Sequence, residues 1–141
     1  MLNKCIFCKF ANDLSLIPNQ FITDTKDDFV MLSANPQTNG HTLVIPKKHF
    51  SRLIDIPTKL QNKLFIQSIK VGEDLKKLLG AKAYIIKINN ELYKLESSDK
   101  QHIGHIHFHI IPRYKPGEKI SNKPKKGSTK NFKNTQSKFL K

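Results

Sequence analysis

His105-Ile106-His107-Phe108-His109 is the stretch of this 141-residue chain that decides which fold and which function to expect. In an extended strand, successive side chains point to opposite faces of a sheet, so the three histidines would share one face. The isoleucine and the phenylalanine between them would share the other face, which is suited to a core. The pattern therefore predicts a strand with one apolar face and one chemically active face.

The residues around this stretch favour an active site over three histidines that merely face solvent. Imidazole acts as a nucleophile, a proton carrier or a metal ligand near neutral pH. Gly104 has no Cβ, which lets a ligand or another backbone approach closely. Pro112 cannot donate to a strand ladder, so it is expected to end the strand. We expect a strand over residues 103–111 that forms one wall of an active site.

Three blocks of the sequence resemble the histidine-triad (HIT) family. The family signature is His-x-His-x-His followed by two apolar residues, which residues 105–111 match at every position. Residues 35–49 look like the other recurring segment of the family, and they read Asn-Pro-Gln-Thr-Asn-Gly-His-Thr-Leu-Val-Ile-Pro-Lys-Lys-His. Residues 5–8, Cys-Ile-Phe-Cys, look like the N-terminal block of its zinc-bearing bacterial members. Together the blocks look like those of the nucleotide-binding Hint-like branch.

Hydrophobic periodicity predicts an antiparallel α+β domain. Residues 58–79 carry leucines and a valine at helical spacing, and Gly80 after them is a typical helix stop. A short helical turn or loop is expected over residues 8–12. Five runs have strand character: residues 21–23, 28–32, 41–45, 83–88 and 103–111. The resemblance implies the same architecture, a five-stranded antiparallel sheet with one long and one short helix (the HIT-like fold).

Composition separates a domain, residues 1–114, from a basic C-terminal tail, residues 115–141. The tail has nine lysines against one acid, so it holds most of the net charge of +14. It is rich in lysine, asparagine, serine and glycine, and we expect it to be largely disordered. No apolar run is long enough for a membrane span, and no signal-peptide pattern opens the sequence. The cytoplasm is therefore the expected location, with no membrane partner.

An imidazole that attacks the α-phosphorus of a nucleotide divides one slow hydrolysis into two easier steps. The resemblance implies His107 as this nucleophile, with the backbone carbonyl of His105 as the acceptor for its other ring nitrogen. It also implies His41 as a fourth histidine near the site. His41 and His109 would be able to donate hydrogen bonds to the phosphate oxygens. The implied catalytic set is His107, His109, His41 and His105.

Three polar residues correspond to substrate-binding positions of the family. Gln101 and Asn89 would contact phosphate, and the alternative is that they are ordinary polar loop residues. Ser33 stands where the family usually has an aspartate that binds the ribose hydroxyls, and its own hydroxyl is a weaker, neutral acceptor. The implied substrates are purine nucleotides such as AMP or an adenosine phosphoramidate.

Cys5 and Cys8 predict a metal site at the N-terminus. Two cysteines three positions apart in a reducing compartment indicate a metal or free thiols rather than a disulfide. A tetrahedral zinc site needs two more ligands, and the candidates are His49 and His105. Such a Zn²⁺ would be structural, because four protein ligands close its coordination sphere. Free buried thiols are the alternative, and no organic cofactor is expected.

The resemblance implies a hydrolase that cleaves purine nucleoside phosphoramidates or related nucleotide conjugates at the α-phosphate, through a nucleotidyl-histidine intermediate. One alternative is a nucleotide-binding module with little turnover. Another is a domain tethered to nucleic acid by its basic tail, since lysines near phosphates release counterions. The chain lacks the arginine and aromatic interleaving of a stacking platform, which disfavours this third reading. The resemblance also implies a homodimer.

Overall fold

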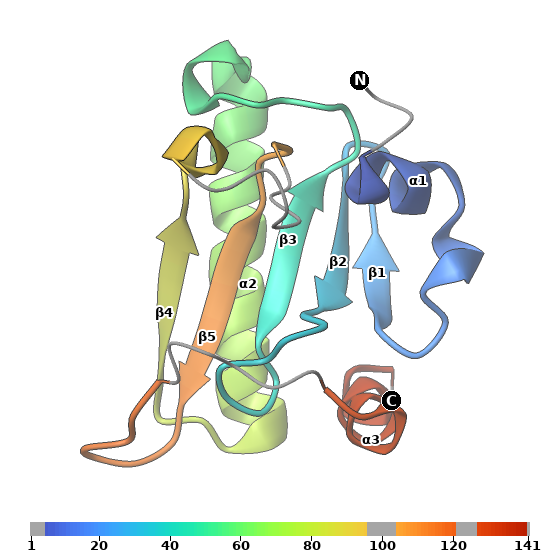
Figure 1. Ribbon diagram of the computed structural model, residues 1–141. Coiled ribbons are helices and arrows are strands. Elements are labelled where there is room, and N and C mark those ends of the chain that lie inside the picture. The colour runs from blue at the N-terminus through green and yellow to red at the C-terminus, as the bar shows by residue number, and fades with distance from the viewer. Residues whose placement is uncertain (1–4, 96–103, 121–126, 141) are drawn as a thin grey trace.

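Five antiparallel strands and one long helix form the framework of the molecule (Figure 1). The computed structural model describes residues 5–95, 104–120 and 127–140. The elements in chain order are α1 (Ile6–Asn12), β1 (Phe21–Asp24), β2 (Asp28–Leu32), β3 (Thr42–Pro46), α2 (Thr58–Leu79), β4 (Ala83–Ile88), β5 (Phe108–Arg113) and α3 (Thr129–Phe139). The strand order is β1-β2-β3-β5-β4, which confirms the predicted α+β class and its five-stranded antiparallel sheet. No helix among the described residues has the length and apolar character needed to cross a membrane.

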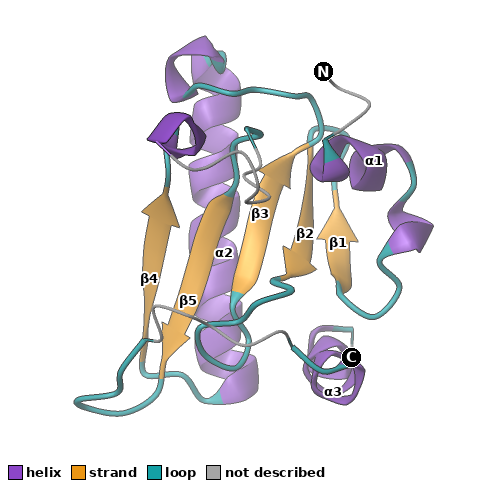
Figure 2. Cartoon of the chain, in the orientation of Figure 1, coloured by secondary structure: helices purple, strands orange, loops and turns teal. Residues whose placement is uncertain are grey.

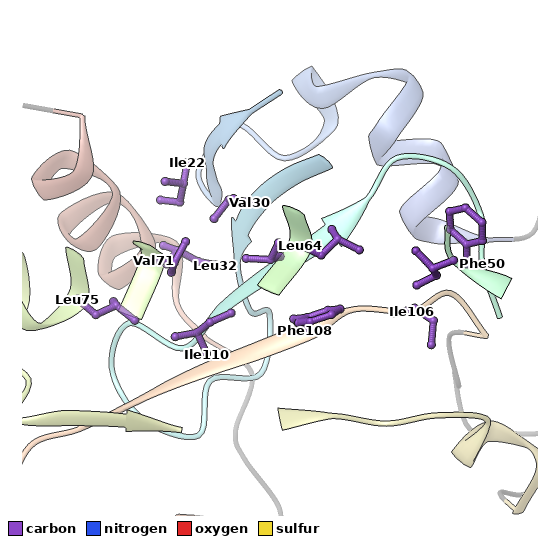
Figure 3. Close-up of a cluster of buried hydrophobic side chains, with 12 residues drawn as sticks. Ile22, Val30, Leu32, Phe50, Leu64, Val71, Leu75, Ile106, Phe108 and Ile110 are labelled. Carbon is purple, nitrogen blue, oxygen red and sulfur yellow. The ribbon is translucent and has the colours of Figure 1, made fainter. Parts of the chain in front are cut away.

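Helix α2 covers one face of the sheet, and its apolar stripe forms the larger core. Leu64, Val71 and Leu75 are buried on this stripe. Figure 3 shows the stripe with the apolar side chains that come before and within β5: Ile106, Phe108 and Ile110. Burial of each such side chain contributes about 1.5–3 kcal/mol. The helix ends as predicted at Gly80, whose φ of 77° is the left-handed conformation that favours glycine at a helix end.

The N-terminal segment covers part of the opposite face and forms a second, smaller core. Phe7 of α1 and Ile17 pack there with Phe29, Met31 and Ile45 of strands β2 and β3. In Figure 1, α1 lies toward the β1 side of the sheet. The histidine-bearing face of β5 therefore flanks this core, and the packing of α1 can influence the site beside it.

Strand β5 begins later and ends later than the sequence predicted. It spans Phe108–Arg113, and the residues just before it are loop (Figure 2). The pairing explains the late start, because both neighbouring strands have their last pair with β5 at Phe108. The expectation that Pro112 ends the strand was wrong. Beyond Ile110 only β4 pairs with β5, and proline is tolerated where one side of a strand is unpaired.

Part of the predicted disordered tail is a helix. Residues 129–139 form α3, whose N-terminus is capped by the Ser128 side chain, which accepts a hydrogen bond from the Asn131 amide. Phe132 and Phe139 pack against the larger core, and Thr135 between them is buried. The spacing of these three residues places them on one helical face, which gives this polar segment a reason to fold. Residues 121–126 and 141 lie outside the described residues.

Candidate active site

The ring of His107 is oriented by a hydrogen bond at one of its two nitrogens. Its Nδ1 lies 2.9 Å from the backbone carbonyl oxygen of His105. A carbonyl can only accept, so Nδ1 carries the proton and Nε2 keeps its lone pair. Burial lowers the pKa of His107, and the bond to the carbonyl opposes that shift. A neutral imidazole with a directed lone pair is the form required of a nucleophile.

His41 and His109 form a second, directed chain of hydrogen bonds. The Gln37 amide donates to His41 Nδ1 at 3.1 Å, which leaves the proton of the neutral ring on Nε2. That nitrogen lies 2.9 Å from His109 Nδ1 and donates to it. His109 therefore carries its own proton on Nε2. This chain of hydrogen bonds thus fixes both tautomers from a single backbone amide. It leaves the Nε2–H of His109 as a further hydrogen-bond donor.

The rings of His41 and His109 are both held neutral at ordinary pH. Burial lowers the pKa of His41 to about 4, and the positive charge of Lys87 and then His107 act in the same direction. Burial also lowers the pKa of His109 to about 3, with further contributions from His107, His41 and Lys87. His41 is only 2% exposed, so an imidazolium there would lose nearly all of its hydration.

Cys5, Cys8, His49 and His105 converge on one point and could hold a metal ion. The Nδ1 atom of His105 lies 3.3 Å from Cys5 Sγ, 3.5 Å from Cys8 Sγ and 3.2 Å from His49 Nδ1. A tetrahedral zinc ion with ordinary bond lengths keeps its nitrogen and sulfur ligands roughly 3.3–3.7 Å apart. These three distances are close to those values, and all four donor atoms lie within 4.8 Å of one another.

The tautomer of His105 also suits a metal ligand. Its Nε2 lies 2.7 Å from the carbonyl oxygen of Pro46, so Nε2 carries the proton and Nδ1 is free toward the cluster. His105 is 1% exposed, and burial lowers its pKa to about 4. The predicted metal set and the predicted catalytic set thus meet in one residue, whose ring faces the cysteines and whose carbonyl holds His107.

The structure describes two of the three predicted substrate-binding residues. Ser33 is buried beside the start of β3, where its amide donates to the carbonyl of His41 at 2.8 Å, and both residues line one cavity of about 230 Å³. Asn89 directly follows the last pair of β4 and β5, Ile88 with Phe108, and so lies at the level of His107. Gln101 lies outside the described residues.

The HIT domain profile matches residues 15–116, which is more than half of the chain. The chain belongs to the HIT family. An uncharacterized HIT-like protein of Methanocaldococcus jannaschii is 40% identical over 111 residues, which cover 78% of this chain and 79% of that protein. Adenosine 5′-monophosphoramidase of Saccharomyces cerevisiae is 32% identical over 109 residues, which cover 77% of this chain and 62% of that enzyme. A crystal structure of a Zn-bound histidine triad family protein from Mycobacterium smegmatis superposes with a TM-score of 0.77 at 24% identity, covering 99% and 96% of the two chains, and shows the shared fold.

Two residues of this HIT site were not predicted from the sequence. The Phe7 ring meets His105 and His107 edge-on, with centroid distances of 5.8 Å and 5.1 Å. Lys87 of β4 pairs directly with His109 across the ladder. The first contact depends on how α1 docks. The second depends on strand register, and it could have been found by aligning the β4 and β5 runs as an antiparallel pair.

Within the HIT domain, the arrangement brings three chemical functions together. His107 offers a lone pair, and His109 offers a fixed N–H donor. The rings of these two residues are adjacent, with centroids 4.7 Å apart. The cysteine–histidine cluster anchors the backbone carbonyl that orients His107. Attack on an electrophile that carries anionic oxygens is the chemistry that this combination fits.

Proposed function

We propose that this protein hydrolyses purine nucleoside phosphoramidates or related nucleotide conjugates at the α-phosphate, through a nucleotidyl intermediate on His107. The observation that carries the proposal is the His107 ring, whose Nδ1 proton is bound to the His105 carbonyl while Nε2 remains a free lone pair. Membership of the HIT family and the name of the yeast relative, an adenosine 5′-monophosphoramidase, support the choice of substrate.

The proposed reaction has two balanced steps. His107 Nε2 gives its electron pair to the α-phosphorus, and the bond from phosphorus to the leaving group breaks. An amine leaves with that bond's electrons and takes up a proton. A water molecule then attacks the phosphorus and loses its proton, and the bond from phosphorus to His107 breaks to release AMP and the free ring. His109 stabilises the charge on the phosphate oxygens in both steps through its Nε2–H.

The test uses adenosine 5′-phosphoramidate and the full-length chain. We expect wild type to release AMP, and protein denatured at alkaline pH during turnover, where a phosphorus–histidine bond is stable, to carry an AMP adduct detectable by intact-mass spectrometry. His107→Asn should lose both the activity and the adduct while still binding AMP in calorimetry, which shows that the pocket is intact. Unchanged hydrolysis by His107→Asn would refute the proposal. If wild type binds AMP but releases none from the phosphoramidate, the protein is a nucleotide-binding module and not a hydrolase.

We propose that the cysteine–histidine cluster holds a structural Zn²⁺. The support is the donor set itself, two thiols and two imidazoles whose ligand atoms all lie within 4.8 Å of one another, with His105 Nδ1 left unprotonated. Elemental analysis of protein purified without a metal-binding tag should give one zinc per chain. The double variant with Cys5→Ser and Cys8→Ser should lose the zinc. The control is Ser51→Ala, which removes the hydroxyl beside His49 Nε2 and should retain the zinc. Zinc-free wild type would contradict the assignment.

We propose that two copies pair through α2 and the β4 edge. The outer face of α2 exposes Phe65 by 50%, Ile66 by 65% and Ile69 by 38%, and β4 is an edge strand with no further partner among the described residues. A second copy can cover both features at once. Wild type should have the mass of a dimer in light scattering, and Ile66→Glu should shift it to monomer. Leu16→Glu, at a residue 55% exposed elsewhere, is the control. A monomeric wild type would overturn this proposal.

A further inference from the structure

The ring of Phe7 packs against the ring of His107. The two ring centroids lie 5.1 Å apart at an interplanar angle of 69°, and Phe7 also meets the ring of His105 at 5.8 Å and 86°. Both distances lie within the range of roughly 4.5–7 Å that is typical of edge-to-face aromatic pairs. Phe7 is 4% exposed, so these contacts belong to the interior of the protein. Phe7 therefore touches both residues that the bond from His107 Nδ1 to the His105 carbonyl joins.

That hydrogen bond alone does not fix the direction of His107 Nε2. The torsion between Cβ and the ring is broad in histidine, and a carbonyl oxygen accepts hydrogen bonds over a wide range of directions. The ring can therefore swing while Nδ1 stays bonded, and Nε2 on the far side of the ring moves with it. Packing against the ring has to remove this freedom.

Phe7 is suited to this task because its contact with His107 is packing alone. The other ring that packs against His107 is that of His109, with centroids 4.7 Å apart. His109 is bonded to His41, and in the proposed reaction it also donates to the phosphate oxygens. Its position therefore depends on the bound ligand, whereas the ring of Phe7 has no polar atom that could respond to one.

Phe7 is itself anchored in two ways. It lies between Cys5 and Cys8 in the first turn of α1, where Cys5 Sγ accepts a hydrogen bond from the Cys8 amide at 3.4 Å. Its side chain also belongs to the smaller core, which contains Met31 of β2 and Ile45 of β3. Phe7 is thus fixed relative to the sheet, and it can fix the ring of His107 relative to the same sheet.

We propose that Phe7 is a positioning residue, whose ring holds the His107 imidazole so that Nε2 points at the phosphorus that it attacks. This inference rests on the proposed function, because it takes His107 as the nucleophile. A misplacement of a reacting group by about 1 Å can lower a rate about a hundredfold. Leucine at position 7 would keep an apolar side chain but would lose the flat ring, so a smaller loss is expected.

The competing explanation is that Phe7 only fills the core. Phe29 provides a matched control, because it belongs to the same core and is fully buried on β2. Strand β3 separates β2 from β5, so Phe29→Leu removes similar packing at a distance from the triad. A role in the core alone predicts that Phe7→Leu and Phe29→Leu both lower stability, and that neither changes the rate per folded molecule.

The first experiment measures the attack itself, with adenosine 5′-phosphoramidate and a saturating excess of the full-length chain. Phe7→Leu should lower the single-turnover rate constant about tenfold, whereas Phe29→Leu should stay within about twofold of wild type. Both variants should keep the wild-type affinity for AMP in calorimetry and the wild-type metal content. An unchanged rate constant in Phe7→Leu overturns the inference. Weaker AMP binding would make Phe7 a substrate-binding residue, and loss of metal would make it a support of the cluster, and either result also overturns it.

A spectroscopic measurement keeps this test independent of turnover. In protein with isotope-labelled histidine, proton–nitrogen correlation spectra at mildly alkaline pH distinguish the two neutral tautomers of His107, whose signals are absent from His107→Asn. Wild type and Phe29→Leu should show the proton on Nδ1. Phe7→Leu should show both tautomers, because water then reaches the bond to the His105 carbonyl. An unchanged tautomer in Phe7→Leu refutes the role of Phe7. Wild type that shows this tautomer but does not hydrolyse the phosphoramidate refutes the proposed function instead.

Discussion

The ring of His107, the proposed nucleophile, is oriented by a backbone carbonyl, a neutral acceptor, rather than by a carboxylate. A carboxylate partner would stabilise the imidazolium and raise the pKa of the ring. The carbonyl opposes the effect of burial only in part, so the pKa of His107 remains lowered. The lowered pKa therefore favours the neutral form that the proposed attack requires.

This arrangement predicts the pH dependence of the proposed reaction. Protonation of His107 Nε2 removes the lone pair, so kcat/KM should fall on the acid side. Because burial lowers the pKa of His107, the midpoint of that fall should lie below 6.5, the ordinary value for histidine. Activity should be level between about pH 7 and pH 8. The measurement is kcat/KM for adenosine 5′-phosphoramidate against pH, and an acid midpoint above 7 would contradict the assigned environment.

Helix α3 is the element that connects the C-terminal segment to the domain. Besides its two phenylalanines, Gln136 Nε2 donates to the carbonyls of Pro18 and Phe21, at 2.7 Å and 2.8 Å. The Gly127 amide donates to the carbonyl of Ala34 just before the helix, at 2.8 Å. Residues of α3 also line the cavity that contains Ser33 and His41. Helix α3 thus contributes to the stability of the region around Ser33 and His41.

Removing an apolar contact of α3 should therefore destabilise the whole domain. Phe132→Ala should lower the free energy of unfolding by about 1–3 kcal/mol, less than for a fully buried phenylalanine because Phe132 is half-buried. Lys133→Ala, at the exposed neighbouring position, should change it by less than about 0.5 kcal/mol. Urea unfolding followed by circular dichroism measures both. Equal stabilities of the two variants would mean that α3 does not pack on the domain in solution.

The elements that could be predicted from the sequence are those with a strong internal pattern. The long helix is correct at both ends, because a helical apolar stripe is followed by Gly80. The start of β5 was wrong because it depends on where β3 and β4 stop pairing with it, which no local pattern reveals. Helix α3 was missed because its polar composition outweighs three inward-facing residues. Its stability comes from a surface formed by other elements.

The candidate site was predictable to the extent that its residues stand in recognisable blocks. The four histidines and the predicted metal ligands came from three such blocks, and the structure brings them together around the start of β5. The directions of their hydrogen bonds were not predictable, since they depend on single backbone groups such as the Gln37 amide and the Pro46 carbonyl. Lys87 was missed because its block carries no signature.

At the scale of the whole molecule, buried neutral histidines make stability depend on pH. His41 and His109 have a pKa of about 4 and about 3 in the folded chain, against an ordinary value of 6.5. Between these values the unfolded chain binds more protons than the folded chain, so folding stability rises with pH. The contribution is fully present above pH 6.5 and is lost as the pH falls toward 4.

We therefore expect the free energy of unfolding to be similar at pH 8 and pH 7 and clearly lower at pH 5. His109→Gln keeps a polar group of similar size but cannot titrate, so its stability should fall less steeply over the same interval. Urea unfolding at each pH gives the slopes. A wild-type stability that stays constant from pH 7 to pH 5, or a slope that is the same in His109→Gln, would contradict the burial of neutral rings.

His105 has two separable duties, since its ring faces the cysteines while its carbonyl holds His107. The matched HIT domain begins at residue 15, after Cys5 and Cys8. The two cysteines of the proposed metal site thus lie outside the matched domain, whereas His49 and His105 lie inside it. A change at either cysteine would therefore reach His107 through the position of the His105 carbonyl.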